Sequence, residues 1–185
     1  SVAASRLGFR SHIYEPAANP PAGQVADRVT TADYDDDDAL AAFADAVDVI
    51  TYEFENIPTA ALDLLEARRP IRPNRRALAV SQDRIAEQDF LTGLGLSCAP
   101  YRAVNTRDDL DAALAEIGTP AILKTTRLGY DGKGQAPIMT PAEGPAALAA
   151  MQGAEAVLEG FVDFAREVSV IVARGLDGAV SCFDP

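Results

Sequence analysis

The sequence has 185 residues, of which 48% are hydrophobic and 24% charged, and its formal net charge is −12. This length suffices for one or two domains with hydrophobic cores, and the acidic excess argues against a surface that binds nucleic acid or an anionic membrane. No apolar run is long enough to span a bilayer, and the first ten residues lack the apolar core of a signal peptide. Cys98 and Cys182 are far apart, which favours buried free thiols in a reducing cytoplasm, and the single histidine, His12, argues against a histidine triad or zinc site.

The first part of the chain alternates predicted helices and strands, the pattern of a parallel sheet with helical crossovers. No predicted strand precedes the first helix, so we expect a strand and a turn upstream of Ser1. Leu40, Phe43 and Val47 share one apolar helix face. The aspartates 35–38 lie at the N-terminus of this helix, where the helix dipole stabilises negative charge. A calcium site in these aspartates is the alternative, although the glycine and glutamate of a calcium loop are absent. The predicted helices cover residues 1–9, 35–47 and 58–67, and the predicted strands cover residues 11–16, 27–36 and 47–56.

A proline- and arginine-rich segment, residues 68–78, is typical of an interdomain connection. We therefore predict two domains, residues 1–75 and residues 76–185. The second is strand-rich, which favours an antiparallel sheet, and its clearest helix carries a capping box of Thr106 and Asp109. The predicted helices cover residues 76–82, 85–94, 106–118 and 141–151, and the predicted strands cover residues 98–104, 120–126, 135–140, 156–162, 166–175 and 179–183.

The segment Arg127–Gln135, RLGYDGKGQ, joins two predicted strands and is rich in glycine. It lacks the Walker A spacing, and a strand rather than a helix follows it. A glycine-rich loop between antiparallel strands can still cover polyphosphate, because glycine lets backbone N–H groups approach phosphate oxygens. Lys133 would add a positive charge. A long mobile hairpin is an equally good interpretation of the loop taken alone.

Two further features surround this loop. Lys124 lies inside an apolar strand, which is unusual unless the lysine pairs with an anion or faces a cleft; a phosphate is one such anion, and an edge-strand lysine with its stem on the sheet is the alternative. Glu159 ends a strand and precedes Phe161 and Val162, against which an adenine could lie, and Glu167 could bind a ribose hydroxyl. The alternative is that these acidic residues are merely solvated.

Together these segments resemble the ATP-grasp superfamily, and within it the N5-carboxyaminoimidazole ribonucleotide synthetase family of purine biosynthesis. The resemblance extends over nearly the whole chain. It is carried by ADYDD, VDVITYEFENIP, RPNRRALAVSQDRIAEQDFL, ILKTTRLGYDGKGQ and VLEGFVDFAREVSVIVAR. It implies an α/β fold: a Rossmann-like, pre-ATP-grasp, parallel-sheet domain followed by part of an ATP-grasp α+β domain.

The resemblance also implies roles for individual residues. Arg84 and Lys124 match family residues that contact ATP phosphates, and Glu53 matches a position near the aminoimidazole ribonucleotide. Tyr130, Asp131 and Lys133 match the part of the loop that family members bring to the substrate, so they are the predicted catalytic residues. The predicted nucleotide-binding residues are Arg84, Lys124, Gly129, Tyr130, Asp131, Gly132, Lys133, Gly134, Gln135, Glu159, Gly160, Phe161, Val162 and Glu167.

The implied reaction uses Mg-ATP to activate bicarbonate, carboxylates the exocyclic amine of aminoimidazole ribonucleotide, and releases ADP and phosphate. A homodimer is implied, with neither nucleic acid nor membrane as partner. The family's magnesium ligands would lie beyond Pro185 and its substrate-phosphate turn before Ser1, so we expect the 185-residue piece alone to be inactive. The alternatives are a ligase of the glycinamide ribonucleotide transformylase or biotin carboxylase type, a non-catalytic ATP-binding module, and a purely structural α/β domain.

Overall fold

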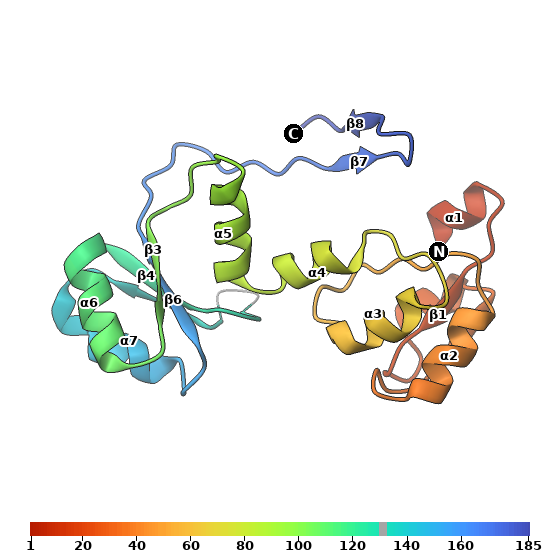
Figure 1. The fold of residues 1–185 in the computed structure, drawn as a ribbon, viewed down its shortest axis with the longest axis horizontal. Helices are drawn as coiled ribbons and strands as arrows, with labels where there is room; N and C mark the ends of the chain where they lie inside the picture. Colours follow the sequence, from red (N-terminus) through yellow and green to blue (C-terminus); the bar gives the residue numbers. More distant parts are fainter. Residues whose placement is uncertain (130–132) are drawn as a thin grey trace.

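The chain folds around two separate hydrophobic cores, as a computed structural model describes for residues 1–129 and 133–185. The first core contains buried residues between positions 40 and 78, and the second contains buried residues between positions 104 and 158. Two helices, α4 (Arg75–Ser81) and α5 (Arg84–Gly93), connect the two units (Figure 1). Each unit is therefore built from a continuous stretch of chain.

The first unit contains a small parallel sheet. β1 (His12–Tyr14) pairs in parallel with β2 (Arg28–Thr30), and Ile50 forms a single parallel bridge with Ile71. The apolar face predicted for residues 35–47 is confirmed, because Leu40 and Phe43 are buried in the core. The parallel pairing confirms the predicted Rossmann-like character of this unit. Its other elements are α1 (Val2–Arg6), a 3-10 helix (Pro21–Val25), α2 (Asp37–Asp45) and α3 (Thr59–Glu66).

Two features of this unit differ from the sequence-based expectation. The strand predicted for residues 47–56 is reduced to the bridge at Ile50. After that bridge the backbone makes hydrogen bonds with a side chain rather than with a neighbouring strand. The carbonyls of Glu55 and Ile57 accept these bonds from the side chain of Gln82. The segment 68–78 is also more than a connection, because its Ile71 and Leu78 belong to the first core. The domain boundary at residue 75 stays a prediction.

The second unit is the predicted antiparallel sheet, covered by two helices. Its strand order is β3-β6-β4-β5, and every neighbouring pair is antiparallel. The helices α6 and α7 lie side by side against the sheet (Figure 1), and Leu110, Leu114 and Ala147 from these helices join the core. The predicted capping box of Thr106 and Asp109 is present at the start of α6. The elements are β3 (Tyr101–Val104), α6 (Arg107–Ile117), β4 (Ala121–Thr125), β5 (Gln135–Ile138), a 3-10 helix (Pro141–Glu143), α7 (Gly144–Ala150) and β6 (Ala156–Gly160).

The last part of the chain forms an exposed hairpin apart from the four-stranded sheet (Figure 1). It consists of β7 (Val172–Arg174) and β8 (Val180–Cys182), so β7 is much shorter than the strand predicted for residues 166–175. Every residue from 161 to 185 is exposed. Both cysteines are free thiols, but the prediction that both are buried is wrong, because Cys98 is half-buried and Cys182 is exposed on this hairpin. In the part of the chain that the structure describes, no helix combines the length and apolar character needed to cross a bilayer.

Candidate functional site

The junction between α4 and α5 carries a buried glutamine that contacts both units. Gln82 is only 4% exposed. Its side-chain Nε2 donates to the carbonyls of Glu55 and Ile57, each at 2.6 Å, and its Oε1 accepts from Arg127 Nη2 at 2.6 Å. The loop after Ile50 and the start of the glycine-rich loop therefore meet at one side chain. Sequence reasoning did not select Gln82.

The next two residues hold the glycine-rich loop from the same junction. Asp83 caps α5 by accepting hydrogen bonds from the backbone N–H groups of Ile85 and Ala86. The backbone N–H of Arg84 donates to the carbonyl of Thr126, and its Nη1 donates to the carbonyls of Thr125 at 2.6 Å and Leu128 at 2.8 Å. In the structure this guanidinium therefore organises the loop backbone. Its predicted contact with ATP phosphate stays a prediction.

The glycine-rich loop closes in a backbone conformation that excludes larger residues at two positions. Gly129 and Gly134 have φ values of +94° and +66°. A Cβ on Gly129 would lie 2.8 Å from the carbonyl oxygen of Lys133, and one on Gly134 would lie 2.7 Å from Thr125 Oγ1. The N–H of Thr125 donates to the carbonyl of Gly134 at 2.8 Å and closes the loop at its base. These glycines are therefore required by the shape of the loop.

The predicted catalytic residues are only partly within the described chain. Tyr130 and Asp131, together with the predicted nucleotide-binding residue Gly132, lie outside the described residues. Lys133 is described and exposed, at the point where the chain returns to β5. Gln135, the first residue of β5, is exposed and lies opposite Lys124 in the register with β4.

Lys124 lies in the middle of the sheet and pairs with a carboxylate. Its strand, β4, is flanked by β6 and β5, so the alternative of an edge-strand lysine is wrong. Lys124 Nζ lies 2.6 Å from Glu159 Oε2 on β6, and the side chains are 25% and 13% exposed. Gln88 Nε2 on α5 donates to the other oxygen of Glu159 at 2.7 Å. The expectation that this lysine pairs with an anion is confirmed, and two predicted nucleotide-binding residues are in contact.

The segment after β6 leaves a backbone donor available beside two exposed apolar side chains. The N–H of Gly160 donates to the Pro100 carbonyl at 2.8 Å, and that of Phe161 donates to the Pro120 carbonyl at 3.1 Å. Within the described residues the N–H of Val162 makes no hydrogen bond. Phe161 and Val162 are 53% and 49% exposed. A purine that packs on them would use the N–H of Val162, since that of Phe161 is already occupied.

Acidic groups gather around Arg84 in the same region. Burial, and then the neighbouring carboxylate of Glu55, raise the pKa of Glu87; Glu159 adds to this effect and the guanidinium of Arg84 opposes it. Within the described residues there is no group of three His, Cys, Asp or Glu side chains placed to hold a metal ion. Glu167, the predicted ribose ligand, is exposed and has no hydrogen bond or ion pair among the described residues. The structure therefore does not bring Glu167 to the pair of Lys124 and Glu159.

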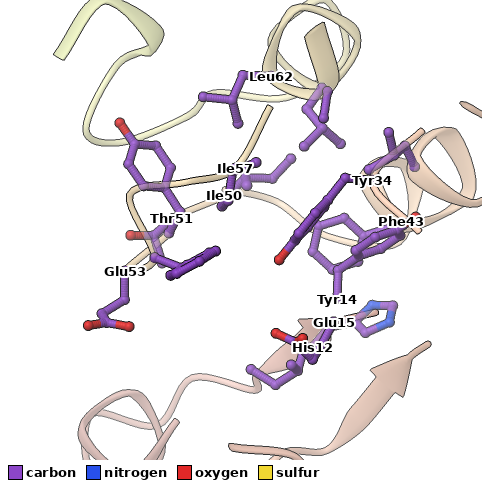
Figure 2. A pocket seen from close by; sticks show the side chains of 16 residues that line it. His12, Tyr14, Glu15, Tyr34, Phe43, Ile50, Thr51, Glu53, Ile57 and Leu62 are labelled. Atoms are coloured by element: carbon purple, nitrogen blue, oxygen red, sulfur yellow. The ribbon is translucent and has the colours of Figure 1, made fainter. Parts of the chain in front are cut away.

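Glu53 lies at the rim of an aromatic cavity in the first unit. The cavity has a volume of about 230 Å³. Figure 2 shows the rings of Tyr14, Tyr34 and Phe43 across the cavity from Glu53, whose carboxylate points away from them. The ring centroids of Tyr14 and Tyr34 are 5.9 Å apart, those of Tyr14 and Phe43 are 5.4 Å apart, and burial raises the pKa of the Tyr14 hydroxyl. We did not predict this cavity, because Tyr14, Tyr34 and Phe43 come from three separate segments of the chain.

The two units correspond to two known domains. The preATP-grasp domain of ribonucleotide synthetases matches residues 1–82, and the ATP-grasp domain matches residues 89–185. The antiparallel sheet with its central lysine and the glycine-rich loop lie within residues 89–185, which match the ATP-grasp domain. The chain therefore belongs to the ATP-grasp family.

Within that family, the similarity to N5-carboxyaminoimidazole ribonucleotide synthases that the motifs predict is confirmed. The chain is 50% identical over 186 aligned residues to the N5-carboxyaminoimidazole ribonucleotide synthase of Brucella melitensis, covering 100% of this chain and 51% of that protein. A crystal structure of an N5-carboxyaminoimidazole ribonucleotide synthetase with ADP superposes with a TM-score of 0.94 at 39% identity, covering 98% of this chain and 48% of the other. The Aspergillus clavatus enzyme with ADP and 5-aminoimidazole ribonucleotide gives a TM-score of 0.87 at 25% identity, covering 98% and 48%. The chain thus spans about half the length of the relatives it matches.

Proposed function

We propose that the protein to which this chain belongs uses ATP and bicarbonate to carboxylate 5-aminoimidazole ribonucleotide, giving N5-carboxyaminoimidazole ribonucleotide, ADP and phosphate. Lys124 carries this proposal. It lies on a central strand beside the glycine-rich loop, 2.6 Å from Glu159. Glu159 in turn precedes Val162, whose backbone N–H makes no hydrogen bond within the described residues. The relatives described above include proteins solved with ADP and with 5-aminoimidazole ribonucleotide.

The nucleotide site would be formed by the second unit. Lys124 neutralises phosphate charge, and Glu159, held by Gln88, fixes the direction of the lysine side chain. The loop from Gly129 would cover the phosphates with backbone N–H groups. Glycine at positions 129 and 134 permits the shape of the loop, because a Cβ there would collide with Lys133 or Thr125. Phosphoryl transfer depends on such positioning and charge neutralisation more than on a nucleophilic side chain. A closed loop also keeps water away from an acyl phosphate.

The ribonucleotide would bind next to the first unit. Glu53 lies three residues after the parallel bridge at Ile50 and lines the aromatic cavity. In parallel α/β sheets, ligands gather at the carboxyl ends of the strands. The next residues after Glu53 are bonded to Gln82, which also contacts Arg127 at the start of the loop. We further propose that Tyr130, Asp131 and Lys133 act at the reacting groups, and that Arg84 and Glu167 contact the nucleotide.

Several finer points belong to the same proposal. We propose that the reaction uses Mg²⁺, as ATP-grasp ligases do; the described residues contain no group of three His, Cys, Asp or Glu side chains placed to hold a metal ion. Magnesium supplies charge neutralisation on the phosphates when it is bound. We propose a cytoplasmic homodimer that acts on small molecules and has neither nucleic acid nor membrane as a partner.

Phosphate release tests this proposal in a protein that contains this chain and has the length of its relatives. We expect release to require ATP, bicarbonate and aminoimidazole ribonucleotide together. Release without the ribonucleotide would instead indicate another ATP-grasp ligase. ATP binding without any release under all conditions would indicate a non-catalytic nucleotide-binding module.

Two variants with matched controls assign the sites. Lys124→Ala should raise the ATP requirement by more than tenfold, since one lost charge-assisted contact of about 1.5–3 kcal/mol corresponds to that factor or more. Arg102→Ala is its control, because Arg102 is an exposed strand cation in the same sheet that pairs with Glu116. Glu53→Gln should mainly raise the ribonucleotide requirement, with the exposed Glu66→Gln as control. If Lys124→Ala and Arg102→Ala behave alike, Lys124 is not a nucleotide ligand.

A further inference from the structure

Gln82 uses both amide N–H donors and its carbonyl oxygen to hold two loops at once. A primary amide has two N–H donors and one carbonyl acceptor. Both donors of Gln82 are used on the loop after Ile50, at the carbonyls of Glu55 and Ile57, and the acceptor is used by Arg127. All three distances are 2.6 Å.

Burial makes this arrangement an all-or-none link. With Gln82 only 4% exposed, water cannot readily replace a lost partner, and an unpaired buried polar group is destabilising. Rotation of the amide to follow one loop would break its bonds to the other. The positions of the two loops are therefore tied to each other through one side chain.

Each loop leads directly to a proposed ligand site. The carbonyl of Glu55 is two residues after Glu53, the proposed ribonucleotide contact. Arg127 lies between Thr125 and Leu128, whose carbonyls are held by Arg84, and it begins the loop proposed to cover the nucleotide phosphates. Residues 82–84 thus contact both the ribonucleotide loop and the base of the phosphate loop.

We propose that Gln82 and Arg127 are positioning residues through which nucleotide binding and ribonucleotide binding strengthen each other. The first ligand to bind fixes its own loop and, through the shared amide, the second loop. The second ligand then loses less binding free energy to ordering its loop. This inference rests on the proposed function, because it needs both ligands to bind.

Isothermal titration measures the link in a protein that contains this chain and has the length of its relatives. The dissociation constant of 5-aminoimidazole ribonucleotide is measured with and without saturating ADP, and the reciprocal pair is measured for ADP. We expect ADP to tighten ribonucleotide binding at least about fivefold in the parent protein, the lower end of typical coupling between sites. Arg127→Gln should reduce this factor to below about twofold, while each ligand alone still binds.

Three companion variants separate positioning from general damage. Arg127→Lys keeps a donor for Gln82 Oε1 and should retain part of the coupling. Gln82→Leu removes the link from the other side and should also abolish the coupling. Arg107→Gln, on the exposed face of α6 where Arg107 pairs with Asp111, should leave the coupling unchanged.

The possible results are distinct. Parent-like coupling in Arg127→Gln, or no coupling in the parent although both ligands bind, would overturn the inference and leave the proposed function standing. Failure of the parent to bind either ligand would overturn the proposed function and the inference with it. Loss of coupling in Arg107→Gln would show that any change in surface charge has this effect, which also overturns the inference.

Discussion

Substitution of Gly134 by alanine should destabilise the chain through two separable effects. The φ of +66° places the residue in the left-handed region, where a residue with a Cβ is about 1–2 kcal/mol less favourable. The new Cβ would also lie 2.7 Å from Thr125 Oγ1 and 3.3 Å from Thr125 Cγ2. Relief of such an overlap in a packed region typically requires roughly 1–3 kcal/mol. We therefore expect Gly134→Ala to lower the free energy of unfolding by about 2–5 kcal/mol.

Equilibrium unfolding in urea measures this loss, with the slope of the transition checked for constancy. Gly153→Ala is the matched control, because Gly153 has a φ of +82° but no atom within 4 Å of the added Cβ. It should show only the backbone effect, roughly 1–2 kcal/mol. In a Thr125→Ala background, which lacks both overlapping atoms, Gly134→Ala should also fall to roughly that value. Equal losses for Gly134→Ala and Gly153→Ala would refute the steric argument.

Three further predictions concern pH dependence and helix capping. Burial, and then the positive charge of Arg28, lower the pKa of His12 below 6.5, so the unfolded chain binds this proton more tightly and stability falls as the pH drops below 6.5. His12→Gln should flatten that acid-side decline in thermal unfolding. The raised pKa of Glu87 makes stability depend on pH in the opposite direction. Its contribution to the free energy of unfolding is present at low pH and is lost as the pH rises through the raised pKa. Glu87→Gln should therefore stabilise the chain more at pH 7 than at pH 4, which is close to the ordinary pKa of glutamate. Asp83→Ala removes the cap of α5 and should lower stability by about 1 kcal/mol, whereas Asp83→Asn should retain most of it.

Each of these predictions has a contradictory result. An unchanged acid-side slope in His12→Gln would mean that His12 titrates alike in the folded and unfolded chains. A gain from Glu87→Gln that is equal at pH 4 and pH 7 would exclude a charge effect. Equal losses for the alanine and asparagine variants of Asp83 would show that its side chain is not acting as a hydrogen-bond acceptor at the cap.

Features that depend on nearby residues were predicted correctly. The capping box of Thr106 and Asp109 involves groups only three positions apart, and the structure contains it. The expectation that Lys124 either pairs with an anion or faces a cleft follows from the apolar pattern around it. The identity of that anion does not, because Glu159 lies 35 positions further along the chain. Only the strand order places β4 beside β6.

Gln82, which contacts both units, was missed for the same reason. Gln82 is a polar residue at the end of an apolar helix, which is an ordinary surface pattern in a sequence. Its partners lie 25 to 45 positions away on both sides, so its burial depends on how the units meet. The prediction of a strand for residues 47–56 was wrong because an apolar composition does not show whether a neighbouring strand is available to pair with this segment. In the structure the side-chain amide of Gln82 donates hydrogen bonds to the backbone carbonyls of Glu55 and Ile57 instead.

The order of strands in the second sheet constrains when that sheet can form during protein synthesis. β6 lies between β3 and β4, so the outer strand β3 has no place in the sheet until residue 160 has been made. The hairpin of β4 and β5 can pair as soon as residue 138 has emerged, whereas the first core is complete at residue 78. We therefore expect a nascent chain in which the first unit is folded while β3 is still unpaired. The partner of β3 is β6, which begins more than fifty residues further along the chain. A pause in translation between β5 and β6 would prolong the exposure of that edge.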